Sequence, residues 1–286
     1  MTAAVGLHIG TERGFPAAVE SAQELGAEAV QIFTSDPAAW RSKMVDGRAA
    51  HAFTDALREV GARTVVSHAN YLINMAGSEE PIYSKSCAAL ADELQRGAAY
   101  GLDHVIVHVG SHKGSGLDAA YEHIVNAVEG ALAAVPAEGS PRLLLENSAG
   151  TGDNVGGHFE ELAELLRRLE PHRGRVGVCF DTAHAHSAGY EMTGAEMAGD
   201  AIAQLDDVLG LENVFVIHAN DTQVPAGGKA DRHWHIGEGM LGEDTFALLL
   251  HHPIVGELPF ILETPGDEHT EGRRNLEVLK SLRRSS

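Results

Sequence analysis

Short apolar runs rich in β-branched residues alternate with longer amphipathic stretches along the whole chain. The short runs predict buried strands, and the longer stretches, rich in Ala, Leu and Glu, predict helices. The predicted strands span residues 5–9, 29–33, 64–68, 104–108, 142–146, 176–181, 214–218 and 259–263. The predicted helices span residues 16–25, 49–60, 82–100, 117–135, 159–169, 195–209, 245–251 and 269–282.

This strict alternation predicts a parallel sheet, because each return to a parallel strand needs a crossover helix. Eight such units are typical of a (β/α)8 TIM barrel, an α/β fold whose active site lies at the C-terminal ends of the strands. Gly26, Gly61 and Gly101 follow helical patterns, at positions where a left-handed residue is expected to end a helix. No linker-like tract divides the 286 residues, so we expect a single domain over residues 1–286.

The composition is that of a globular protein with a large acidic excess. Hydrophobic residues make up 44% of the chain and charged residues 22%, which allows a substantial core. The formal net charge of −20, from 41 acidic and 21 basic residues, argues against a broad basic surface for nucleic acid. It does not exclude a DNA enzyme that holds divalent cations, because bound ions can reverse the sign of the local charge.

The sequence also favours a reducing compartment. Cys87 and Cys179 lie far apart, and Cys179 falls in an apolar strand, so we expect both to be reduced thiols. The N-terminal residues lack a basic region followed by a long apolar one, and no apolar run is long enough to span a bilayer. We therefore expect a cytoplasmic protein that has no membrane contact and is a monomer.

The ends of the predicted strands carry imidazoles and carboxylates, which a barrel would direct into one mouth. Each such residue by itself is more often a hydrogen-bonded structural group than a metal ligand. Several carboxylates in one cleft, however, repel each other unless cations lie among them. The residues that end strands three to eight, followed by those in the loops after strands six and seven, are His68, His108, Glu146, Asp181, His218, Glu263, His184, Asp231 and His233.

This donor set indicates a cluster of metal ions. With 17 His and 2 Cys in the chain, the expected ligands are imidazole and carboxylate, which suit zinc first and manganese or iron next. The predicted ligands are too many for one tetrahedral ion and suit two or three. Paired ions generate a nucleophile from water and neutralise the attacking and leaving oxygens, so the cluster favours hydrolysis of a phosphate ester.

Several segments that contain these residues resemble the endonuclease IV family of apurinic/apyrimidinic endonucleases, which are metal-dependent DNA repair enzymes with a TIM-barrel fold. The segments are HANYLIN (68–74), VHVGSH (107–112), LEN (145–147), DTAHAHSAGY (181–190), HAND (218–221), DRH (231–233), IGEG (236–239) and ETP (263–265). Each segment alone is a weak signal. Together, in this order, they extend the resemblance over most of the chain.

The resemblance implies three zinc ions, with Mn²⁺ or Fe²⁺ as substitutes. One ion would be held by His68, His108 and Glu146. The second would be held by Glu146, Asp181, His218 and Glu263, and the third by His184, Asp231 and His233. Glu146 would bridge the first two ions and orient the water between them. The implied reaction is cleavage of the phosphodiester 5′ to an abasic site, which leaves a 3′-hydroxyl and a 5′-deoxyribose phosphate.

The segments expected to contact DNA depart from the family pattern. The family has an Arg and a Gln that enter the duplex where this chain has Ala38 and Ala39, and the loop over residues 8–14 is also changed. Tyr71, Arg232 and Lys229 are the expected DNA contacts. In the family the inserted Arg and Gln form a wedge that holds a nucleotide out of the duplex. Moving a nucleotide out of the stack costs a few kcal/mol, so loss of the wedge predicts weaker recognition of abasic duplex. The hydrolytic chemistry should be retained.

Two alternatives stay open at this stage. A sugar isomerase or epimerase of the xylose isomerase-like group would share the barrel and use one or two divalent ions, but it would not need the ligand group of His184, Asp231 and His233. A zinc-storage or DNA-end-binding protein would retain metal without turnover. The number of ions bound per chain separates the isomerase from the nuclease.

Overall fold

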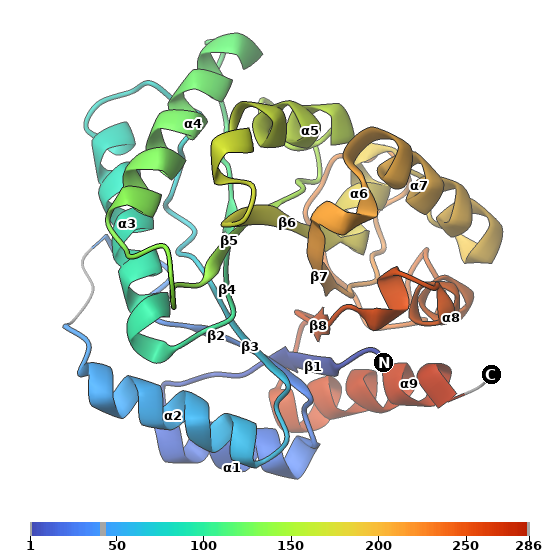
Figure 1. The fold of residues 1–286 in the computed structure, drawn as a ribbon. Helices are drawn as coiled ribbons and strands as arrows, with labels where there is room; N and C mark the ends of the chain where they lie inside the picture. The colour runs from blue at the N-terminus through green and yellow to red at the C-terminus, as the bar shows by residue number, and fades with distance from the viewer. Residues whose placement is uncertain (1, 41–43, 285–286) are drawn as a thin grey trace.

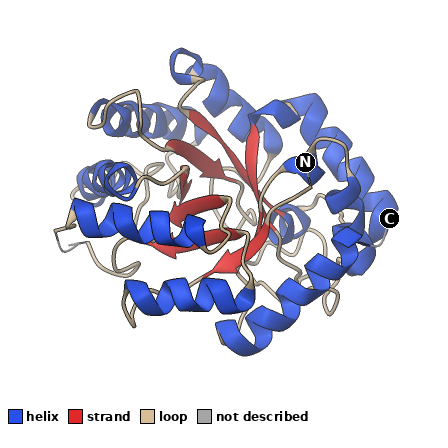
Figure 2. Cartoon of the chain, turned by 60° about the horizontal axis from the view of Figure 1, so that its bottom comes forward, coloured by secondary structure: helices blue, strands red, loops and turns tan. Residues whose placement is uncertain are grey.

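The computed structural model of the chain describes residues 2–40 and 44–284. Eight parallel strands close into a barrel in sequence order, and helices surround it (Figures 1 and 2), so the predicted TIM barrel is confirmed. The strands are β1 (Val5–His8), β2 (Ala29–Phe33), β3 (Thr64–His68), β4 (His104–His108), β5 (Arg142–Glu146), β6 (Val176–Asp181), β7 (Val214–His218) and β8 (Phe260–Leu262). Residues 1, 41–43, 285 and 286 of the predicted domain lie outside the described residues.

The helices follow the predicted pattern with two differences. A short helix, α6, begins immediately after β6 where a loop was expected, and the last helix starts with a π-helical turn, η4. The helices are α1 (Phe15–Leu25), α2 (Gly47–Glu59), α3 (Ile82–Tyr100), α4 (Leu117–Ala133), α5 (Phe159–Arg168), α6 (Thr182–Ala188), α7 (Gly194–Leu209), α8 (Glu243–His251), η4 (Glu268–Gly272) and α9 (Arg273–Arg284). Three 3-10 turns, η1 (Glu170–His172), η2 (Leu211–Asn213) and η3 (Val255–Glu257), precede β6, β7 and β8.

Helix ends behave as the glycine pattern predicts. Gly26 and Gly101 have φ angles of 60° and 69° and end α1 and α3, because only glycine adopts this left-handed conformation without strain. Both strands that follow, β2 and β4, begin three residues later. Within the described ranges, no helix is long and apolar enough to cross a membrane.

The core has two layers separated by the strands. The larger layer packs between the outer faces of the strands and the helices, and it includes Val178 and Phe180 of β6. The smaller layer fills the barrel interior, where each strand, or the residue just before it, contributes one side chain. Its members are Ala4, Ala29, Val66, Ile106, Leu144, Cys179, Val216 and Ile261.

This interior layer positions the polar residues above it. Side chains alternate between the two faces of a strand, so the residue two positions after an interior residue also points into the barrel. On β5, Glu146 follows the interior Leu144 at this spacing, and on β6, Asp181 follows Cys179. His68, His108, His218 and Glu263 follow their interior residues in the same way. The alternation places them in one layer at the C-terminal mouth.

Candidate metal centre

Strand register brings the predicted ligands side by side at the mouth of the barrel. His108 at the end of β4 pairs with Glu146 at the end of β5, and Asp181 at the end of β6 pairs with His218 at the end of β7. Glu263 lies one residue past β8, not within it as predicted, and its backbone N–H donates to Asn220. The candidate ligands at the ends of strands 3 to 8 therefore converge at the mouth of the barrel.

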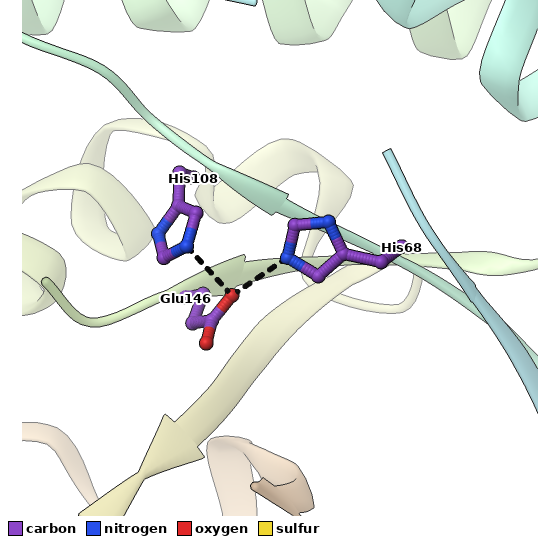
Figure 3. Close-up of side chains that lie close together, drawn as sticks. All are labelled: His68, His108 and Glu146. Atoms are coloured by element: carbon purple, nitrogen blue, oxygen red, sulfur yellow. Dashed lines mark hydrogen bonds and ion pairs between the residues drawn. The ribbon is translucent and has the colours of Figure 1, made fainter. Parts of the chain in front are cut away.

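The first ligand group is formed by His68, His108 and Glu146, which point toward one another in Figure 3. The Oε2 atom of Glu146 lies 3.0 Å from Nε2 of His68 and 3.4 Å from Nε2 of His108. His68 and Glu146 are buried, whereas the His108 side chain is 33% exposed, so this group opens toward solvent on one side.

The second ligand group combines the other oxygen of Glu146 with Asp181, His218 and Glu263. Nδ1 of His218 lies 2.8 Å from Oε1 of Glu146 and 3.1 Å from Oε2 of Glu263. Cys179 also lies near this group, but burial raises the pKa of its thiol to about 12, and a protonated thiol is a poor ligand. Glu146 is thus shared by the first and second groups.

The third ligand group joins two segments that are distant in sequence. Nε2 of His184 lies 3.1 Å from Oδ1 of Asp231 and 3.3 Å from Nε2 of His233, and the latter two atoms are 3.6 Å apart. His184 lies in helix α6 and not in a loop, because Asp181 caps that helix by accepting a hydrogen bond from the His184 N–H. Nε2 of His233 also lies 3.4 Å from Oδ2 of Asp181, which connects the third group to the second.

The hydrogen bonds of three histidines orient one ring nitrogen toward the carboxylates. In each ring Nδ1 faces a backbone carbonyl, which can only accept, so Nδ1 carries a proton and donates it. In the neutral ring the Nε2 lone pair then faces carboxylate oxygens, an arrangement that is repulsive without a cation between them. The pairs are His68 with Ala69 (2.7 Å), His184 with Asn147 (3.0 Å) and His233 with Glu263 (3.3 Å).

The charges of the site favour a cation or bound protons on these nitrogens. Burial lowers the pKa of His184, but the negative charges of Asp181, Asp231 and Glu146 outweigh it and raise the pKa to about 10. Burial raises the pKa of Glu263, but the neighbouring His218 more than offsets it and brings the pKa to about 2. Tetrahedral zinc ligands at about 2.0–2.2 Å from the ion lie roughly 3.3–3.6 Å apart, which fits the third group's 3.1–3.6 Å.

Comparison with known proteins identifies the family. The family model described as "Xylose isomerase-like TIM barrel" matches residues 19–283. The chain is 38% identical over 278 residues to a probable endonuclease 4 of Methanoculleus marisnigri, covering 97% of this chain and 98% of that protein. A probable endonuclease 4 of Solibacter usitatus is also 38% identical, over 97% of this chain and 96% of that protein. The chain belongs to the endonuclease IV family. The predicted resemblance, and with it the prediction of an enzyme, is confirmed.

Solved structures agree with this placement. The crystal structure of endonuclease IV from Thermus thermophilus has a TM-score of 0.85 to this chain at 34% identity, and 99% of each chain is covered. A D-tagatose 3-epimerase-like protein has a TM-score of 0.75 at 17% identity, over 99% of this chain and 97% of that chain, which shows a shared fold alone. The barrel is therefore common to both classes, and the family assignment rests on the endonuclease relatives.

The residues that the family pattern suggests for DNA contact lie around the centre. The Tyr71 side chain is 66% exposed, and its ring centroid lies 5.4 Å from that of Phe33 and 6.0 Å from that of His68. Arg232 and Lys229 are exposed in the loop that also carries Asp231. Lys229 has a φ angle of 52°, and its backbone is held at both ends, because its N–H donates to Ser187 and its carbonyl accepts from Thr151.

The loop that carries Ala38 and Ala39 is held by hydrogen bonds of its backbone. The carbonyl of Ala39 accepts a hydrogen bond of 2.8 Å from the Asn70 side chain, and the carbonyl of Pro37 accepts one of 3.0 Å from the Tyr71 N–H. Ala38 is exposed and Ala39 is half-buried, both on the segment tied to Tyr71. The hydrogen bonds to Asn70 and Tyr71 therefore fix the backbone on which the Ala38 and Ala39 side chains stand.

Sequence reasoning missed the carboxamides that hold the ligands. Nδ2 of Asn220 donates to Oδ2 of Asp181 (2.7 Å), and its Oδ1 accepts from the Glu263 N–H (2.8 Å). Gln31 contacts His218 and Glu263, and its signal was a polar residue in an otherwise apolar strand. His186 of α6 accepts a hydrogen bond at Nδ1 from the Met192 N–H.

Proposed function

We propose that the chain is a zinc-dependent DNA repair endonuclease that hydrolyses the phosphodiester 5′ to an abasic site, leaving a 3′-hydroxyl and a 5′-deoxyribose phosphate. The single observation that carries the proposal is the third ligand group, since His184, Asp231 and His233 lie within 3.6 Å of one another beside two further groups. A cluster of three ions suits a phosphodiester better than a sugar substrate.

Zinc ions held by these groups would supply Lewis acidity and an activated water. The protein's part is to place the donors before substrate arrives. Glu146 turns one oxygen to each of the first two groups, so we assign to it the positioning of the attacking water. Asp181 lies between the second and third groups and would keep their separation constant. His68, His108, His218 and Glu263 would complete the ligand shells.

Two cavities flank the centre, and their charges differ. A groove of about 360 Å³ is lined by His68, His108, His184 and Asp231, and its outer wall includes Tyr71 and Lys113. A larger cavity of about 610 Å³ is lined by four acidic residues and one arginine, namely Glu12, Glu263, Asp267, Glu268 and Arg13. Because this excess of carboxylates repels phosphate, we place the DNA backbone over the first groove.

The proposed DNA contacts are Tyr71, Arg232 and Lys229. An exposed tyrosine beside the centre can stack on a sugar or base, and the two cations can neutralise backbone phosphates. Replacing Arg232 or Lys229 by Ala should reduce the slope of log affinity against log salt by about 1 each. Arg173→Ala is a matched control, because Arg173 is exposed just before β6, at the opposite end of the barrel.

Weakened recognition of abasic duplex is part of the proposal. Ala38 and Ala39 cannot hold a nucleotide out of the stack, so already distorted or single-stranded DNA should be cleaved relatively well. The test uses metal-free protein, zinc add-back and oligonucleotides with one abasic site, as duplex and as single strand. Zinc-dependent incision 5′ to the site is expected. Absence of metal-dependent incision of both forms would overturn the proposal.

A matched pair of glutamate variants tests whether Glu146 is required for incision. Glu146→Gln should abolish incision, while Glu122→Gln, at an exposed position of α4, should leave it unchanged. About three zinc ions per chain are expected, and Mn²⁺ or Fe²⁺ should substitute. A single magnesium or manganese ion per chain, with no incision, would instead indicate a sugar isomerase.

We propose further that the protein acts in the cytoplasm as a monomer. Cys87 and Cys179 are both free, which suits a reducing compartment. Thiol titration of freshly isolated protein should find both reduced, and sedimentation should give the mass of one chain. A stable dimer at micromolar concentration would contradict the second part.

A further inference from the structure

Gln31 is a buried polar side chain within the apolar strand β2. It follows the interior Ala29 by two positions, so it occupies the same barrel layer as the strand-borne ligand residues. Its carboxamide is fully buried and contacts His218 and Glu263 of the second ligand group. A buried amide needs partners for both its donor and its acceptor, and these contacts provide them.

The orientation of this carboxamide follows from its partners. Nε2 of Gln31 donates to Oε1 of Glu263 at 2.6 Å, and a carboxylate oxygen that serves as a metal ligand only accepts. The amide nitrogen must therefore face Glu263. The amide oxygen then faces Nε2 of His218 at 2.8 Å, and because this oxygen only accepts, Nε2 of His218 carries a proton.

The other nitrogen of His218 is thereby assigned to the ligand group. Nδ1 lies 2.8 Å from Glu146 and 3.1 Å from Glu263, on the side where the carboxylates converge. We infer that Gln31 is a positioning residue: it keeps the proton of His218 on Nε2 and directs the Nδ1 lone pair toward the ion shared by Glu146 and Glu263. This inference rests on the metal centre of the proposed function. Partners of this kind typically contribute 10–100-fold in metal affinity.

A pair of length-matched variants tests this role. Gln31→Met keeps the side-chain length and removes the contacts to His218, Glu263 and His8. Gln23→Met makes the same change at an exposed position of α1. Metal-free protein is titrated with Zn²⁺ against a chelating competitor, after circular dichroism has shown that each variant is folded. Gln31→Met should bind one ion about 10–100-fold more weakly and the others normally. Gln23→Met should bind as the unaltered protein does.

A second measurement needs no substitution. Long-range ¹H–¹⁵N spectra of the zinc-loaded protein should show the His218 proton on Nε2, and those of Gln31→Met should show loss of this single tautomer. A proton on Nδ1, or unchanged affinity for every ion in Gln31→Met, would overturn the inference. If the protein binds zinc without cleaving abasic DNA, the proposed function fails while the affinity data still decide the role of Gln31. Failure to bind zinc at all overturns both.

Discussion

His184 and Asp231 meet at 3.1 Å although one side chain is 2% exposed and the other 60%. His184 is fixed in the helix after β6, and Asp231 reaches it from the long loop after β7. The third ligand group therefore combines a buried residue of the barrel with residues of a surface loop.

This relationship predicts the effect of removing His184. His184→Ala should lower the zinc content by about one ion per chain and leave the first two groups loaded, since their ligands lie on other residues. His251→Ala, at an exposed position of α8, is the matched control. Elemental analysis after dialysis measures the result. Loss of all ions, or of none, would show that the three groups are not separate.

Metal binding should release protons. The negative charges around His68, His184 and His218 raise their pKa values despite burial, so without metal these rings bind a second proton more readily than a free imidazole, and zinc must displace it. Zinc affinity should therefore increase from pH 6 to pH 8. Calorimetry in two buffers with different ionisation enthalpies measures the protons released. An affinity that falls as the pH rises over this range would contradict the expected sign.

Restoring the wedge should restore duplex recognition. Ala38→Arg combined with Ala39→Gln should raise the affinity for abasic duplex by at least about tenfold, because the extruded state costs a few kcal/mol. Cleavage of single-stranded abasic DNA should change little. Ala133→Arg with Ala134→Gln, at the exposed end of α4, adds the same groups away from the mouth. An equal gain from this control would mean that charge alone caused the effect.

Glu28 should make the fold sensitive to acid. Its carboxylate accepts hydrogen bonds from Arg283 (2.6 and 2.8 Å) and Arg63 (2.8 Å), which outweigh burial and lower its pKa to about 2. The pKa of Glu28 is lower in the folded protein than its unfolded value of about 4.5, so the ionised carboxylate stabilises the fold at pH values above about 4.5. This stabilisation is lost as the pH falls toward 2. Glu28→Gln should therefore lower the free energy of unfolding by about 1–3 kcal/mol at pH 7.

The difference between Glu28→Gln and the unaltered protein should narrow below pH 4.5, which urea unfolding at several pH values can follow. Glu122→Gln serves as the exposed control. A constant difference from pH 7 to pH 3 would mean that packing, and not the ion pairs, accounts for the loss.

The amino-acid sequence by itself determined the barrel and the members of its candidate centre. Strand and helix periodicities are local properties, so the ends of the strands were predicted within one residue, and candidate ligands such as His68 and Asp181 could be recognised as strand ends. Ala38 and Ala39 were singled out by the resemblance to the endonuclease IV family. The start of α6 was missed because its cap, Asp181, was assigned only as a ligand.

The resemblance implied how these residues are grouped, but only the tertiary structure shows the contacts that bring each group together. Closure of the barrel brings both oxygens of Glu146 between two sets of imidazoles, and it brings Gln31 of β2 against His218 of β7. Neither contact follows from a short-range pattern, because each depends on strand register and on which face a side chain occupies. The tautomers of His184 and His218 also depend on the tertiary structure. Each is set by an acceptor from another part of the chain, the Asn147 carbonyl for His184 and the Gln31 side chain for His218.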